Sequence, residues 1–91
     1  MKWKNRLSDW HGRTVEIRIE DKAGQDPIAE PRTCLLHRIE VTPDDRYVQF
    51  YISDHQFMAV PVFDQEHTVL ESDVFESHDT QAKLVYHIRI V

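Results

Sequence analysis

Residues 46–63 read RYVQFYISDHQFMAVPVF, and they form the longest apolar-rich run in the chain. On either side of Asp54 and His55 the residues alternate, as they do in strands whose successive side chains point to opposite faces. β-Branched and aromatic residues, which favour strands, dominate both halves. The stretch therefore predicts a β-hairpin. Its expected core face consists of Val48, Phe50, Ile52, Met58, Val60 and Val62.

The opposite face of this hairpin carries four aromatic side chains, Tyr47, Tyr51, Phe57 and Phe63. Cross-strand pairing would bring Tyr51 near Phe57. Exposed on a monomer, such a patch marks an interface, and the four residues are the candidate binding site. The alternative is a second core, in which the N-terminal tryptophans or residues 69–75 cover the same side chains.

The N-terminal segment predicts a short amphipathic helix, because Trp3, Leu7 and Trp10 follow each other at i, i+4 and i+7. A helix this short is not stable alone, so it should lie on the rest of the domain and close one end of a sheet or barrel. Trp3 and Trp10 are therefore candidates for core packing. The alternative is that they form a contact with a partner.

Two further stretches alternate cleanly, residues 14–20 and residues 83–91, and both predict strands. The last strand is expected to pair within a sheet, closing on the first. Residues 21–32 are polar, contain Gly24, Pro27 and Pro31, and predict a long loop. Residues 64–80 are compatible with either a second hairpin or a flap.

Residues 33–41 predict one more strand. Alternation places four of its side chains inward and the others outward; the inward set is Leu35, His37, Ile39 and Val41. Residues 42–45, TPDD, predict a tight turn, because proline presets φ at its second position and aspartates favour turn geometry. With the hairpin that follows, this strand would form a continuous three-strand meander.

Composition fits one small soluble domain spanning residues 1–91. The N-terminus lacks the apolar core of a secretory signal, and no run of 18 apolar residues suggests a membrane span. Cys34 is the single cysteine, which favours a reducing, cytoplasmic location and a small packed side chain over a nucleophile. Two glycines leave no phosphate-binding loop, and no nucleophile elbow occurs, so we expect neither an enzyme nor a bound cofactor.

Charge is distributed unevenly along the chain. Residues 1–13 carry four basic side chains and one acidic one, whereas residues 64–79 carry six acidic side chains and no lysine or arginine. The net charge is −5. Because neutralisation of phosphates by Lys and Arg supplies most non-specific affinity for nucleic acid, an acidic domain of this kind is not expected to bind nucleic acid generally.

The histidines show no spacing typical of a metal site. There are six, His11, His37, His55, His67, His78 and His87. We therefore expect no metal site and interpret most of them as exposed turn residues. One alternative stays open, since His67 and His78 would meet if residues 67–80 formed a hairpin.

The element order resembles the Sm-like and SH3-type small barrels over about residues 3–63. It comprises a helix-like lead, Gly12 before the strand VEIRI, a loop and a three-strand meander. The resemblance implies a mainly β fold: a small antiparallel, partly closed barrel of five or six strands with a short N-terminal helix. Sm proteins bind RNA through motifs in two loops, and the corresponding segments here, residues 42–45 and 64–67, read TPDD and DQEH and contain neither motif.

The function expected from these features is that of a non-catalytic protein-interaction or self-associating module, a small cytoplasmic accessory or regulatory protein. Its partner would be another protein or a second copy of the chain, and a homo-oligomer is expected. The alternative is RNA binding in the manner of Sm proteins through the basic N-terminal segment.

Overall fold

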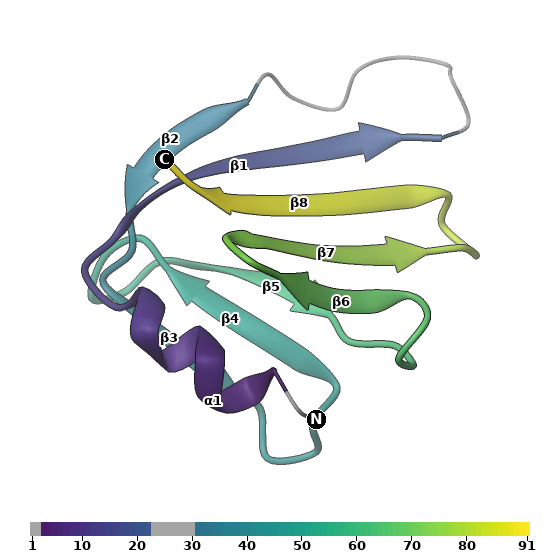
Figure 1. Ribbon diagram of the computed structural model, residues 1–91, viewed down its shortest axis with the longest axis horizontal. Coiled ribbons are helices and arrows are strands. Elements are labelled where there is room, and N and C mark those ends of the chain that lie inside the picture. Colours follow the sequence, from purple (N-terminus) through teal and green to yellow (C-terminus); the bar gives the residue numbers. More distant parts are fainter. Residues whose placement is uncertain (1–2, 23–30) are drawn as a thin grey trace.

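The computed structural model describes residues 3–22 and 31–91 (Figure 1). The predicted loop at residues 21–32 thus lies largely outside the described residues. The chain starts with the short helix α1 (Lys4–Leu7), which continues into the 3-10 turn η1 (Ser8–Trp10). Eight strands follow: β1 (Thr14–Asp21), β2 (Arg32–Leu35), β3 (Arg38–Val41), β4 (Tyr47–Tyr51), β5 (Phe57–Pro61), β6 (Thr68–Glu71), β7 (Val74–Asp79) and β8 (Leu84–Ile90).

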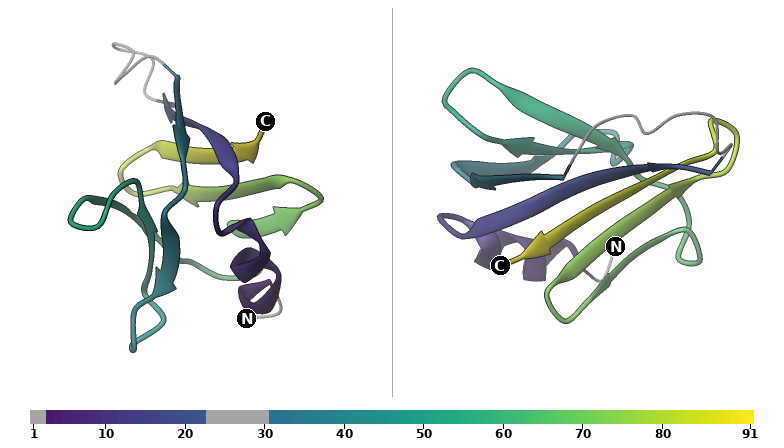
Figure 2. Two further views of the ribbon diagram at one scale, coloured as in Figure 1. Left: turned by 90° about the vertical axis from the view of Figure 1, so that its left-hand side faces the viewer. Right: turned by 90° about the horizontal axis from the view of Figure 1, so that it is seen from above.

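The strands form two antiparallel sheets, one of five strands in the order β2-β1-β8-β7-β6 and one of three in the order β3-β4-β5. Figure 2 shows the sheets packed against each other with α1 at one end. The mainly β, antiparallel fold with a short N-terminal helix is confirmed. The prediction of a single barrel of five or six strands is not, because the described chain has eight strands and no strand pairing joins the two sheets.

The predicted hairpin is confirmed as β4 and β5. Its register pairs Val48 with Val60 and Tyr51 with Phe57. Val48, Phe50 and Val60 are fully buried, as the alternation predicts. The hairpin therefore contributes one wall of the core.

The prediction for residues 33–41 is wrong in two respects. The segment is not one continuous strand, and two of the four residues expected to point inward, Leu35 and His37, are exposed. Leu36 bonds through both backbone groups to the two residues just before β1, donating to Arg13 O and accepting from Gly12 N. The next residue, His37, donates its N–H to Tyr51 O in the other sheet, although Arg38 is the register partner of Tyr51. Two residues thus oppose one, as in a β-bulge.

The bulge shifts the phase of the side chains by one residue. Leu36 is therefore fully buried, while Leu35 is 59% exposed and His37 is exposed. Beyond the bulge the predicted phase is restored, and Ile39 packs against the core. The continuous meander is corrected accordingly: β2 pairs with β1, and only β3, β4 and β5 form a meander.

The C-terminal half completes the larger sheet. The predicted pairing of the last strand with the first is confirmed, with Ile17 opposite Ile88. Of the two alternatives for residues 64–80, the structure shows the hairpin, β6 and β7, joined at Ser72 and Asp73. Ser72 has a φ of 50°, the left-handed conformation that this tight turn requires.

The core lies between the sheets and under the helix. Phe50 of one sheet meets Phe75 of the other with ring centroids 5.5 Å apart, and Trp3 contacts Phe75 edge-on at 5.2 Å. Leu7 and Trp10 are also buried. Among the described residues, no helix has both the length and the apolar character needed to cross a membrane.

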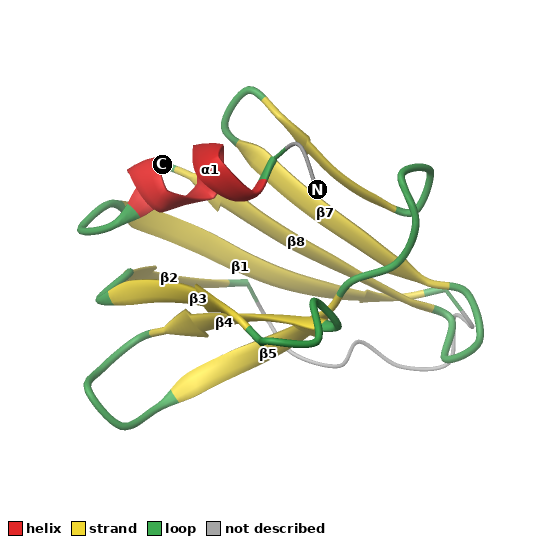
Figure 3. Cartoon of the chain, turned by 90° about the horizontal axis from the view of Figure 1, so that it is seen from below, coloured by secondary structure: helices red, strands yellow, loops and turns green. Residues whose placement is uncertain are grey.

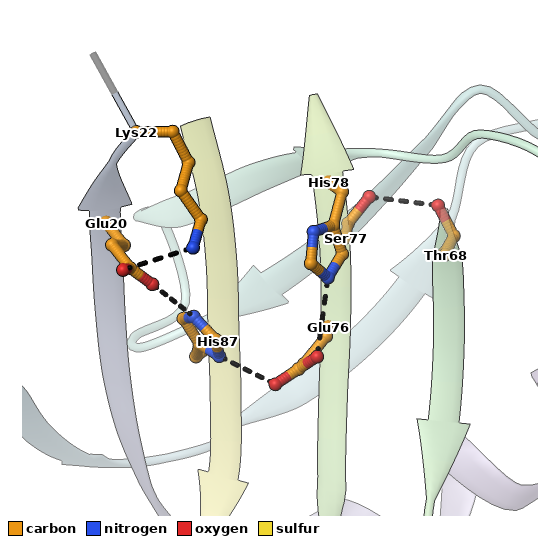
Figure 4. Close-up of polar contacts among 7 residues, drawn as sticks. All are labelled: Glu20, Lys22, Thr68, Glu76, Ser77, His78 and His87. Atoms are coloured by element: carbon orange, nitrogen blue, oxygen red, sulfur yellow. Dashed lines mark hydrogen bonds and ion pairs between the residues drawn. The ribbon is translucent and has the colours of Figure 1, made fainter. Parts of the chain in front are cut away.

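A buried polar network holds the chain where it passes back from the smaller sheet to the larger one. The Thr68 and Ser77 hydroxyls lie 2.9 Å apart and are buried (Figure 4). The Ser77 hydroxyl donates to Pro61 O at 2.5 Å, and the Phe63 N–H donates to Thr68 Oγ1 at 2.7 Å. The network therefore links the end of β5 to β6 and β7.

Leu36→Ala should lower the free energy of unfolding by about 2–5 kcal/mol, because it leaves a cavity in a fully buried site. Its neighbour provides the control, since Leu35→Ala at an exposed site should change stability by less than about 0.5 kcal/mol. Urea denaturation followed by circular dichroism measures both values. A larger loss of stability in Leu35→Ala than in Leu36→Ala would contradict the bulge.

Ser77→Ala should cost about 1–3 kcal/mol, because it leaves the carbonyl of Pro61 and the hydroxyl of Thr68 without their buried partner. The double variant Ser77→Ala with Thr68→Val should cost less than the sum of the two single changes, since it removes both members of the hydroxyl pair. Additive effects in urea denaturation would count against a shared network.

Candidate functional site

The outer face of the three-stranded sheet carries three of the four predicted aromatic residues. We call Tyr47, Tyr51 and Phe57 the aromatic face. Tyr47 is 44% exposed and Phe57 46% exposed. The Tyr51 and Phe57 rings lie 5.0 Å apart, as the cross-strand argument predicts. The alternative of a second core therefore does not apply to Tyr47 and Phe57.

Tyr51 is the buried member of the aromatic face. It is only 9% exposed, because Phe57 packs on one side and the Arg38 guanidinium lies 4.0 Å from its ring centroid. A cation over an aromatic ring at this distance is attractive. Alternation does not reveal this contact, because Arg38 reaches Tyr51 through the pairing of β3 with β4.

Phe63 contributes to a different surface. It lies beyond the end of β5, is 39% exposed, and lines an open groove of about 660 Å³ together with Trp3 and Leu70. Arg6 also lines this groove and donates to Leu70 O at 3.4 Å. Trp3 is half-buried, whereas Trp10 is 4% exposed and belongs to the core. The two tryptophans thus have different surroundings.

A histidine–carboxylate network covers the outer face of the five-stranded sheet (Figure 4). His87 lies between two glutamates, with Nδ1 2.9 Å from Glu76 Oε1 and Nε2 3.3 Å from Glu20 Oε2. His78 Nε2 is 3.4 Å from the second oxygen of Glu76, and Lys22 Nζ is 3.3 Å from Glu20. The strand pairing of β1, β8 and β7 brings these residues together.

The number of hydrogen bonds that His87 can donate in this network depends on its protonation. A neutral imidazole donates from one nitrogen, so His87 can donate to both glutamates only when it is doubly protonated. The hydrogen bond from His87, assisted by Lys22, holds the pKa of Glu20 below its ordinary value of 4.5. The arrangement is therefore a surface network of hydrogen-bonded histidine, glutamate and lysine side chains across three strands.

Of the remaining histidines, His37 and His67 each pair with a separate carboxylate, whereas His11 Nε2 accepts the N–H of Ile39 at 3.3 Å. His37 lies 2.6 Å from Asp54, and His67 lies 2.6 Å from Asp64. The backbones of His67 and His78 do meet, since the N–H of His78 donates to His67 O at 2.8 Å. Within the residues that the structure describes, no group of three or more His, Cys, Asp or Glu side chains is arranged to hold a metal ion.

Cys34 is half-buried, and burial raises the pKa of its thiol. It faces Val15 across the β1–β2 pair and packs against the core. With Ile17, Ile52 and Met58 it lines a small cleft of about 240 Å³. A raised pKa disfavours the thiolate that a nucleophile needs, in keeping with a packed side chain.

Comparison with known proteins gives no relative: no family model, no curated protein and no solved structure matches this chain.

Glu20→Gln should lower the melting temperature at pH 7, and its difference from the wild type should shrink as the pH falls. The pKa of Glu20 is lower in the folded chain than in the unfolded one, so its contribution to stability is fully present above about pH 4.5. It is lost as the pH drops through the lowered pKa. A melting series from pH 7 to pH 3 tests this. Glu71→Gln removes the same charge from an exposed position and is the control.

Proposed function

We propose that this chain is a non-catalytic module that binds protein, a second copy of itself or another chain, through the aromatic face. The observation that carries the proposal is the exposure of Tyr47 and Phe57 on a sheet surface that no described element covers. Figure 3 shows the three-stranded sheet as one outer layer of the molecule. Tyr and Phe are enriched at protein interfaces, where they contribute a large contact area.

The charge pattern of the two strands supports this function. β4 reads YVQFY and β5 reads FMAVP, so neither strand contains a charged residue in a chain that is 30% charged. Depletion of charge at the centre of a patch is the compositional mark of an interface. The outer face of the larger sheet, by contrast, carries the histidine–carboxylate network around His87.

Protein is favoured over RNA as the partner by the contacts of the N-terminal segment. Trp10 is buried and cannot stack on a base, Lys4 pairs with Asp45 at 3.4 Å, and Arg6 reaches Leu70 O. The net charge of −5 opposes binding to phosphates. The proposed module acts in a reducing cytoplasmic setting, where Cys34 needs no disulfide partner.

The wild type should have a solution mass of at least two 10.8-kDa chains, and Phe57→Ser and Tyr47→Ser should each shift it toward the mass of one chain. Each change removes exposed apolar area from the aromatic face and leaves the core unchanged. Sedimentation equilibrium over a wide concentration range measures the mass. Leu35→Ser is the control, because Leu35 is 59% exposed on the other sheet.

A wild type with the mass of one chain at the highest concentration would contradict self-association. An oligomer that neither serine variant weakens would contradict the choice of surface. Binding of single-stranded RNA at low salt, falling steeply as salt rises, would favour the alternative function.

A further inference from the structure

The two sheets end in four edge strands, and three of the four carry charge. β2 contains Arg32, β3 contains Arg38 and Glu40, and β6 contains Glu71. Charged residues on an edge strand disfavour its pairing with another chain. β5, with the sequence FMAVP, is the edge without such protection.

Two hydrogen bonds determine which backbone groups of β5 face outward. The N–H of Val62 donates to Arg46 O at 2.8 Å, and the N–H of Ile52 donates to Gln56 O at 3.0 Å. Because hydrogen-bonded pairs recur every second residue, the even-numbered residues of β5 bond to β4. Phe57, Ala59 and Pro61 thus direct their backbone groups away from β4.

Only two of these three residues are open for pairing. Pro61 has no N–H, and its carbonyl accepts the Ser77 hydroxyl at 2.5 Å. The N–H and C=O groups of Phe57 and Ala59 have no hydrogen-bond partner within the described chain. Both residues are exposed. The free edge therefore offers two donors and two acceptors on neighbouring outward-facing residues.

We propose that β5 pairs antiparallel with β5 of a second copy, with Phe57 opposite the partner subunit's Ala59 and Ala59 opposite the partner subunit's Phe57. This register places a two-fold axis beside Met58. It satisfies all four free groups of each chain through four intermolecular hydrogen bonds. The two three-stranded sheets become one six-stranded sheet, whose outer surface is a continuous aromatic face. The inference rests on the proposed function and specifies its partner and geometry.

The occupant is a second copy because of the charge pattern. A two-fold interface brings the residues near its axis close to their own counterparts, so a charged residue there would repel its copy. An uncharged strand pair in a chain of net charge −5 meets this requirement.

A head-to-tail contact of β5 with β6 fits the structure less well. The N–H of Thr68 on that edge already donates to Asp64 O at 2.9 Å, and Arg6 reaches Leu70 O. The free edge of β6 is therefore partly occupied by groups of the chain itself, whereas the edge of β5 at Phe57 and Ala59 is not.

Charge pairing at residue 59 tests the geometry. In the proposed register the two copies of Ala59 are diagonal neighbours on one sheet face, about 7–8 Å apart. Ala59→Lys and Ala59→Glu should therefore each be monomeric in sedimentation equilibrium, and an equimolar mixture should restore the two-chain mass. Thr33→Lys adds the same charge to the exposed edge strand β2 and should leave the mass unchanged. Circular dichroism verifies that each variant is folded.

A second measurement follows the pairing directly. The amides of Phe57 and Ala59 should exchange with solvent more slowly as the wild-type concentration rises, while the exposed turn amide of His55 should not change.

Monomeric Lys and Glu variants that fail to associate on mixing, together with unprotected amides, would overturn the β5 pairing. If Phe57→Ser still dissociated the wild-type oligomer, the proposed function would stand. A wild type that is monomeric throughout would overturn the β5 pairing and self-association through the aromatic face.

Discussion

The fold depends on the passage of one extended segment from the first sheet to the second between Leu36 and His37. Leu36 bonds to Gly12 and Arg13 just before β1, and the N–H of His37 begins the bonding to β4. Because both backbone groups of Leu36 and the N–H of His37 are hydrogen-bonded, the two sheets are held against each other without a strand pairing between them. The buried side chain of Leu36 fills the space beneath the crossing.

The return passage is held by different chemistry. Between β5 and β6 the chain relies on the Thr68 and Ser77 hydroxyls, which bond to the backbone at Phe63 and Pro61. Apolar contacts such as that of Phe50 with Phe75 tolerate small displacements, whereas a buried hydroxyl without its partner is costly. The apolar core therefore supplies most of the stability, and the hydroxyl pair selects one arrangement of the sheets.

Sequence periodicity was sufficient where a strand is regular. Alternation identified the β4–β5 hairpin and the pairing of β8 with β1, and helical spacing identified the stripe of Leu7 and Trp10. It failed at His37, because a bulge adds one residue to a strand and shifts every side chain on one side of it. A single sequence contains no signal for that extra residue.

The candidate site was predictable to a similar degree. Tyr51 and Phe57 meet because hairpin register is a local property, and the exposure of Tyr47 follows from the same alternation. Phe63 does not lie on the aromatic face, because β5 ends at Pro61, two residues before it. The cluster around His87 could not be predicted, since it depends on the relative register of β1, β7 and β8, whose residues lie far apart in the sequence.

The distribution of charge over the strand edges has a further consequence for the size of any assembly. If two copies join through β5, the uncharged edge strand of each copy is paired. The resulting six-stranded sheet then ends at β3 on each side. There Arg38 and Glu40 oppose the addition of another chain. Pro61 also limits the shared ladder to two residues of each strand. The addition of further chains at the sheet edges would therefore stop at the dimer. In a fibril, by contrast, strands continue to stack without limit.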